Sequence, residues 1–192
     1  MLEIKIVFFI LSTFFQTEEH RIFAEKTSVT ISQKDKTVEI VQSQLFALIE
    51  TEEEIQRASE QWKALTQTKT SQLQWAEALE AFPEKQVQQK SAKITSPQGT
   101  APISLILTLR YAKEEDLQAL GIWFDKAKNE FSINEISQLR IQSQDGRQEG
   151  NYWYFDAAKP VSFTLLPLVN DATVPKQYKK IPLEEVLRYH KK

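Results

Sequence analysis

A stretch of strict alternation near the middle of the chain constrains the fold more than any other feature. Successive side chains of a β-strand point to opposite faces of the sheet, so apolar residues at every second position define a buried face. The stretch has apolar residues at Ile103, Leu105, Leu107, Leu109 and Tyr111, separated by Ser104, Ile106, Thr108 and Arg110. We therefore expect a sheet strand here, with one face packed on a core.

Other segments predict further strands joined by turns. They are rich in β-branched and aromatic residues, with turn-forming residues between them. Three hairpins are expected, at 27–32 with 36–42, at 122–124 with 130–133, and at 139–142 with 151–155. Asp145-Gly146 marks the third turn, because glycine accepts the positive φ that such turns demand. The pattern is also β from Val87 onward, and residues 161–165 predict one more strand.

The main helical signals follow the first hairpin. Thr51 and Glu54 form a capping box, in which a hydroxyl and a carboxylate satisfy free backbone N–H groups at a helix start. The helix that follows has apolar residues at helical spacing, namely Ile55, Ala58, Trp62 and Leu65. A second helix is expected from Ser71 to Pro83, with an apolar side formed by Leu73, Trp75, Ala76, Leu79 and Phe82. Neither helix can cover its apolar side alone, so we expect a helical hairpin lying on the sheet.

The pattern as a whole predicts an α+β fold. We expect an antiparallel sheet of about six or seven strands with an N-terminal helical hairpin packed on one face. Short helices are also expected at 113–120, ended by Gly121, and at 182–189, with an irregular connection at 170–180. A length of 192 residues favours one core, because a single core becomes efficient at roughly 100 to 150 residues.

Residues 6–15 form an apolar block that follows Lys5. Ten residues of helix rise about 15 Å, half of a hydrocarbon core of roughly 30 Å, so this block is too short to span a bilayer comfortably. It is typical of a signal peptide, with Ala24 as the cleavage candidate. We expect a signal peptide at 1–24 and a single α+β domain with a C-terminal tail at 25–192. The expected location is extracytoplasmic, periplasmic or secreted, with no stable membrane span after cleavage. A retained membrane tether and a cytosolic protein with a buried first strand are the alternatives.

Composition disfavours several classes of function. The net charge is -2, and so even a balance disfavours nucleic-acid binding, which requires a clustered positive field. The chain has no cysteine, which rules out disulfides, thiolate zinc sites and a lipoprotein anchor. Its two histidines, His20 and His190, do not suit a catalytic triad, and its four glycines form no phosphate-binding loop. We expect no metal site and no cofactor, and we favour a protein that is not an enzyme.

Aromatic residues concentrate in the two later hairpins. Trp123 lies in one of them, and Tyr152, Trp153 and Tyr154 follow one another in the other. In a strand Trp153 points to one face and the two tyrosines to the other, so one set should lie outside the main core. An exposed aromatic set suits stacking on a sugar ring or an apolar ligand. These four residues are the predicted ligand-binding surface, and the alternative is that both faces are covered.

Two other functions remain open. A hydrolase acting on polysaccharide needs two carboxylates that flank a bond, and the candidates stand at turns or strand ends, namely Asp125, Glu130, Asp145, Glu149 and Asp156. A structural subunit of an envelope assembly would dock through edge strands. Trp62 and Trp75 form either a partner-binding or membrane-facing stripe or, more often at helical spacing, part of a core. The favoured hypothesis is an exported binding or interaction domain whose partner is an unknown ligand or an envelope protein.

Overall fold

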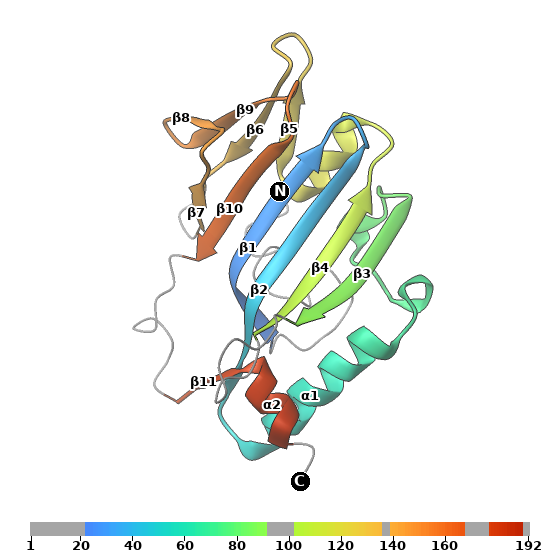
Figure 1. The fold of residues 1–192 in the computed structure, drawn as a ribbon, viewed down its shortest axis with the longest axis vertical. Coiled ribbons are helices and arrows are strands. Elements are labelled where there is room, and N and C mark those ends of the chain that lie inside the picture. Colours follow the sequence, from blue (N-terminus) through green and yellow to red (C-terminus); the bar gives the residue numbers. More distant parts are fainter. Residues whose placement is uncertain (1–21, 92–101, 136–138, 168–176, 190–192) are drawn as a thin grey trace.

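A computed structural model of the chain describes residues 22–91, 102–135, 139–167 and 177–189. This part consists mostly of β-structure, with eleven strands, two α-helices and three short 3₁₀-helices (Figure 1). In chain order the elements are β1 (Ile22–Ser32), β2 (Thr37–Ile49), α1 (Glu52–Gln67), η3 (Thr70–Gln72), η4 (Glu77–Leu79), β3 (Glu84–Ser91), β4 (Ile103–Arg110), η5 (Glu114–Leu120), β5 (Ile122–Asp125), β6 (Glu130–Asn134), β7 (Leu139–Gln142), β8 (Arg147–Glu149), β9 (Tyr152–Asp156), β10 (Val161–Pro167), β11 (Lys179–Pro182) and α2 (Leu183–Tyr189).

Sheet 1 has seven antiparallel strands in the order β3-β4-β2-β1-β10-β7, and β11 pairs with β2 as well. The expected first hairpin is confirmed and is longer than predicted, since β1 and β2 pair from Ser32 with Thr37 to Ile22 with Ala47. On its other side β2 pairs first with β4, through residues 37–42, and then with β11, through residues 46–49. The connection expected to be irregular therefore ends in a strand that completes the sheet.

Sheet 2 has four strands in the order β5-β6-β9-β8. The hairpin expected at 122–124 with 130–133 is confirmed in β5 and β6. The third expected hairpin is wrong, because β7 pairs with β10 in sheet 1, whereas β8 pairs with β9 in sheet 2. The chain thus crosses between the sheets four times, from β4 to β5, from β6 to β7, from β7 to β8 and from β9 to β10.

Gly146 lies in the crossing from β7 to β8, and space rather than backbone conformation requires a glycine there. The described glycines with positive φ are Gly121 and Gly150. A Cβ on Gly146 would lie 2.5 Å from a ring carbon of Phe155 and 2.9 Å from one of Trp153. Phe155 is only 1% exposed, so its ring has little room to move.

Replacing Gly146 with alanine should lower the free energy of unfolding by about 1 to 3 kcal/mol, because both rings must shift within a packed interior. Urea denaturation of the variant and the parent measures this difference. Gly150→Asn is the matched control, since Gly150 has φ +60 with nothing within 4 Å of an added Cβ and asparagine tolerates that backbone region. An equal loss in both variants would contradict the packing explanation.

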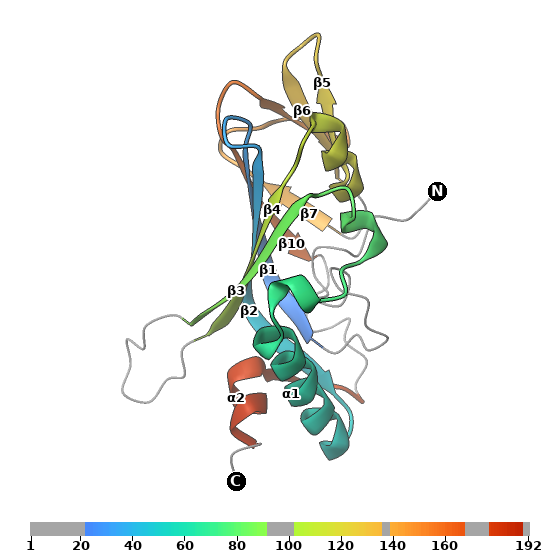
Figure 2. The same ribbon diagram turned by 90° about the vertical axis from the view of Figure 1, so that its right-hand side faces the viewer.

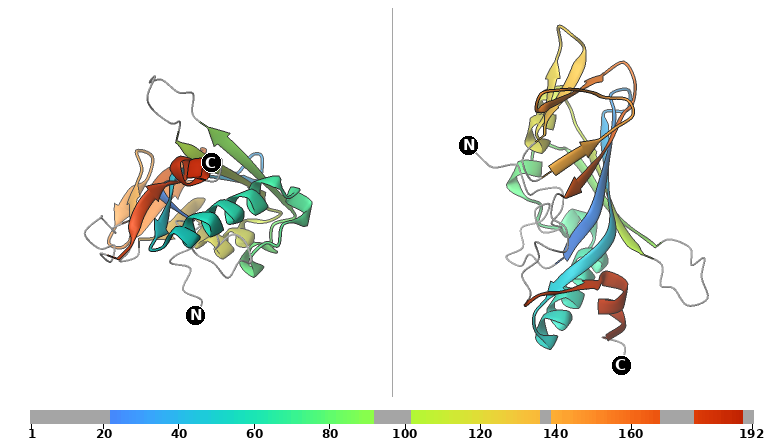
Figure 3. Two further views of the ribbon diagram at one scale, coloured as in Figure 1. Left: turned by 90° about the horizontal axis from the view of Figure 1, so that it is seen from below. Right: turned by 90° about the vertical axis from the view of Figure 1, so that its left-hand side faces the viewer.

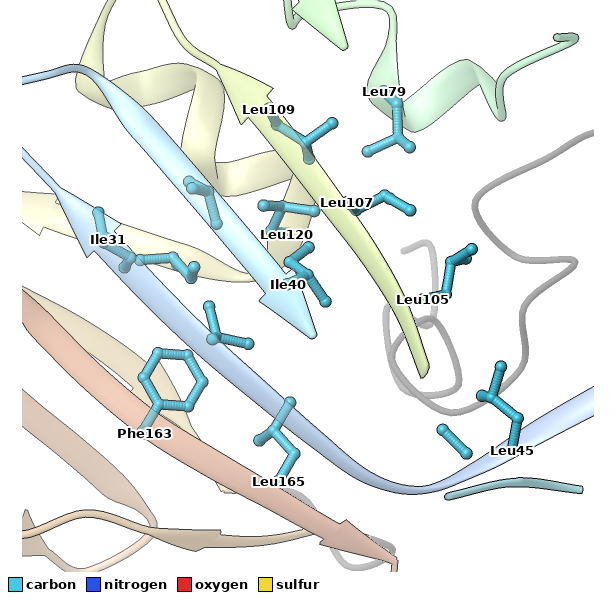
Figure 4. Packing of buried hydrophobic residues seen from close by; sticks show 14 of the residues in the cluster. Ile31, Ile40, Leu45, Leu79, Leu105, Leu107, Leu109, Leu120, Phe163 and Leu165 are labelled. Atoms are coloured by element: carbon cyan, nitrogen blue, oxygen red, sulfur yellow. The ribbon is translucent and has the colours of Figure 1, made fainter. Parts of the chain in front are cut away.

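The core lies on one face of sheet 1. In Figure 4, Leu105, Leu107 and Leu109 of β4 form a row on the face that Leu79 of η4 also enters. Figure 2 shows η4 and η5 on the same side of the sheet. Sheet 2 covers a further part of this face, where the ring centroids of Phe155 and Phe163 are 5.6 Å apart. The two sheets and the 3₁₀-helices therefore enclose one continuous core.

The expected helical hairpin is absent, and the predicted α+β fold class is wrong. The capping box of the first helix is confirmed, because Glu54 accepts hydrogen bonds from the N–H groups of Glu50 at 2.6 Å and Thr51 at 3.4 Å. Residues 71–82 form no α-helix and contain only η4 and part of η3. This segment buries Leu79 and Phe82, which are 1% and 0% exposed. Their burial outweighs the weak tendency of so short a segment to form a helix.

A change in burial phase divides β1 and β2 into two halves. In β1 the buried residues are Ile22 and Ala24, followed by Thr27, Val29 and Ile31. Buried residues are thus two positions apart within each set, but Thr27 comes three positions after Ala24. The same change occurs in β2 next to Gln44, whose φ is 55°. The two halves therefore bury different sets of alternate residues. Both α1 and α2 contact β2, at the lower end of Figure 1.

β1 begins within the range expected for the leader. Ile22 is 1% exposed and Ala24 is 2% exposed, and they pair with Ala47 and Leu45 of β2. A cut after Ala24 would therefore remove part of the core as well as the end of a strand. The apolar block at 6–15 lies outside the described residues. No helix in the described ranges has the length and apolar character needed to cross a bilayer.

Candidate functional site

The outward face of sheet 2 carries three of the four predicted ligand-binding residues. Strand register places Trp123 beside Ser132, Ser132 beside Tyr154, and Tyr154 beside Arg147, so these side chains form one row across four strands. Tyr152 points to the same face one step along β9, with its ring centroid 6.3 Å from that of Tyr154. Trp123 is 40% exposed and Tyr152 is 44% exposed. We call Trp123, Tyr152, Tyr154 and Arg147 the aromatic face.

Trp153, the fourth predicted residue, points to the opposite side of sheet 2. Its ring stacks on that of Phe155 with centroids 6.3 Å apart. Its indole N–H donates to a carboxylate oxygen of Glu135 at 2.8 Å. Trp153 therefore packs against the core while its polar atom reaches the surface, and it is separate from the aromatic face.

Arg147 is a site residue that sequence reasoning missed. Its guanidinium carbon lies 4.9 Å from the ring centroid of Tyr154, which is a cation–π distance. The same guanidinium donates to both carboxylate oxygens of Glu130, at 2.5 and 3.2 Å, and to Glu149 at 2.8 Å. Residues of three strands thus hold Arg147 next to the ring of Tyr154. Its position next to Asp145-Gly146 suggested only a turn, and the pairing of β8 with β9 could not be read from sequence.

The charges of this face are mostly satisfied within it. The hydrogen bonds from Arg147 hold the pKa of the Glu130 carboxyl below its ordinary value, and the same bonds raise the pKa of the Arg147 guanidinium. Outward-pointing acids still outnumber the one arginine, since Asp125, Glu149 and Asp156 share the face with Glu130. The face therefore disfavours anionic ligands.

Three of the carboxylates considered for hydrolysis stand side by side on sheet 2. Glu130 stands between Asp125 and Asp156 in the register. Asp125 accepts hydrogen bonds from the N–H groups of two turn residues, and Asp156 accepts one from Ala158. Asp145 lies in the crossing between sheets, where its own N–H donates to Ser143. A general acid requires a raised pKa, whereas that of Glu130 is lowered.

The other candidate features of the described part lie away from the aromatic face or belong to the core. Hollows of about 440 and 550 Å³ are lined by residues near the start of α1 and by the β1–β2 and β9–β10 turns. Residues 22–91, 102–135, 139–167 and 177–189 contain no group of three His, Asp or Glu side chains that could hold a metal ion. Both histidines lie outside those ranges. Trp62 is buried, at 2% exposed, and Trp75 is half-buried.

Comparisons with known proteins leave the geometry as the only guide to function. No protein-family model matches the chain, and no curated protein and no solved structure is significantly similar to it.

Proposed function

We propose that the protein is a binding domain that takes an uncharged, ring-bearing ligand on the aromatic face, and that an extended sugar chain is the class that fits best. The observation that carries this proposal is the outward row of Trp123, Tyr154 and Arg147 on sheet 2. The exposed ring of Trp123, the half-buried ring of Tyr154 and the guanidinium held beside it supply stacking surfaces, which pyranose rings use through their C–H faces.

Polar side chains beside the rings support a sugar rather than a purely apolar ligand. Ser132 stands between Trp123 and Tyr154, and Asn134 stands opposite Tyr152. Glu149 and Asp156 are exposed on the same face. Hydroxyl, amide and carboxylate groups can bond to sugar hydroxyls while the rings stack, which is the usual division of roles in a ligand site.

Export remains part of this proposal, since residues 6–15 have the character of a signal peptide. Burial of Ile22 and Ala24 in β1 supports a processing point before Ile22 rather than after Ala24. A domain of this kind would meet polysaccharide outside the cytoplasm, at a cell envelope or beyond it.

Chitohexaose and cellohexaose, two uncharged oligosaccharides, are suitable probes for titration calorimetry. We expect at least one of them to bind, and we expect Trp123→Ala to weaken binding about tenfold, because a stacked ring contributes on the order of 1.5 kcal/mol. Tyr154→Ala should weaken binding similarly, since it also removes the support for Arg147.

Tyr189→Ala is the matched control for this experiment. Tyr189 is 65% exposed and lies on α2, away from sheet 2, so its loss should leave the affinity unchanged. Binding that survives Trp123→Ala would remove the aromatic face as the site. If neither oligosaccharide binds, the sugar chain is rejected as the ligand class.

A further inference from the structure

β3 is a long strand at the end of sheet 1. It has eight residues, each paired with a residue of β4 in regular antiparallel register. Among the described strands only β4 pairs with it. Figure 2 looks toward this edge of the sheet, and both views in Figure 3 show one end of the β3–β4 ribbon projecting from the rest of the fold. The outer edge of such a strand offers backbone groups to an added strand.

β3 lacks two of the devices that usually protect an edge strand, a proline and a bulge. Pro83 precedes the strand and no proline lies inside it. No residue of β3 has positive φ, and its unbroken register with β4 contains no bulge. Its charged residues are Glu84, Lys85 and Lys90. Charges block an incoming strand only where they meet like charges, and they favour one that brings opposite charges.

The geometry points to a second copy of this chain as the partner, with the two β3 strands paired antiparallel around a twofold axis at Val87. In this register Glu84 of each copy stands opposite Lys90 of the other copy, and the two Val87 side chains meet. A shift by one residue would instead bring Lys85 opposite Lys90 at both ends. Cross-strand charge pairing therefore selects a single register, and a twofold dimer is the commonest form of homo-oligomer.

The side chains of β3 are placed for this arrangement. Val87 is on the inward face, partly buried against the core, so a second Val87 would extend that core. Glu84 is 64% exposed although it accepts from Arg110 at 3.2 Å, and its carboxylate can take a second cation. Lys90 is exposed. Lys85 is held by its own chain, donating to the Phe82 carbonyl at 2.5 Å.

The dimer is independent of the proposed ligand site. β3 stands at one end of the strand order of sheet 1, and β10 and β7, which lead into sheet 2, stand at the other. Pairing through β3 joins two copies of sheet 1 and leaves both aromatic faces uncovered. The experiments below therefore report on the dimer whether or not a sugar chain binds.

The absence of cysteine from the chain permits a direct test of the register. Val87→Cys in the full chain places one thiol of each copy at the twofold axis, within the 4.4–6.8 Å between Cα atoms that a disulfide needs. We expect mild oxidation to link most of this variant into dimers. Gln89→Cys is the control, since its two thiols would be offset by four residues, about 13 Å along the strands. Equal linking of both variants, or of neither, overturns the proposal.

Charge exchange supplies a second test in the full chain. Lys90→Glu and Glu84→Lys each create like-charge contacts at both ends of the dimer, and each should raise the dimer dissociation constant about tenfold at low salt. In an equal mixture of the two variants, the mixed dimer has both attractive pairs again. Sedimentation of the mixture should therefore detect a dimer. Lys34→Glu, an exposed turn position, should change nothing. The proposal is overturned if the parent chain stays monomeric up to about 1 mM. It is also overturned if the mixture dimerises no more tightly than either variant alone.

Discussion

Trp62→Ala should lower the free energy of unfolding by about 3 to 5 kcal/mol. Trp62 is 2% exposed and lies on α1, which contacts α2, β2 and β3. Removing its indole loses apolar burial and leaves a large void that a helix held on several sides cannot close. Urea denaturation followed by far-ultraviolet circular dichroism measures the loss, because that signal does not depend on the number of tryptophans.

Trp123→Ala is the matched control for that measurement. The same side chain is removed there from a position that is 40% exposed, and we expect a cost of no more than about 1 kcal/mol. The two variants therefore separate a structural tryptophan from a surface one. If Trp62→Ala lowered the free energy of unfolding no more than Trp123→Ala does, the placement of Trp62 on α1 in the core would be wrong.

A chain that starts at Glu25 should be less stable than one that starts at Ile22 by on the order of 3 kcal/mol. The deletion removes the buried Ile22 and Ala24 and the ring of Phe23, which stacks on Phe46 at 5.6 Å. It also uncovers Leu45 and Ala47 of β2, which face those residues. The lost burial and aromatic contact exceed the chain entropy that three residues regain.

Denaturation midpoints of the two shortened chains, each with an initiating methionine, test this expectation. The chain that starts at Ile22 is the control, since it also lacks residues 1–21 but keeps every described residue. Equal midpoints would mean that Ile22 and Ala24 contribute nothing to stability. Cleavage after Ala24 would then be compatible with the fold.

Local signals in the sequence predicted the elements whose partners are near neighbours. The β1–β2 and β5–β6 hairpins, the cap at Thr51 and the last helix are all confirmed, because a turn or a cap is determined by the residues that form it. The alternation in β4 predicted its buried face correctly. These signals extend over a few residues and need no knowledge of distant strands.

The errors arose where distant contacts decide the structure. The apolar spacing at 71–82 suits a helix, yet Leu79 and Phe82 reach sheet 1 without one. Asp145-Gly146 has the composition of a hairpin turn, but its glycine makes room for Phe155 at a crossing between sheets. Residues 179–182 carry no strand signal of their own and become β11 by pairing with residues 46–49. Tertiary packing outweighed local preference in each case.

The aromatic face was only partly predictable, because alternation is a local signal whereas strand register depends on distant contacts. Alternation along β9 separates Trp153 from Tyr152 and Tyr154, which the structure confirms. Strand register, which sequence does not specify, was needed to place Trp123 in the same row as Tyr154 and to bring Arg147 over its ring.

The pairing of β11 with β2 bears on when the protein can fold. On the side of β2 away from β1, residues 46–49 pair with residues 179–182, and β1 pairs with β10 at 161–165. A ribosome must therefore release almost the whole chain before the central strands can complete their hydrogen bonds. Until then β2 keeps part of one edge unpaired.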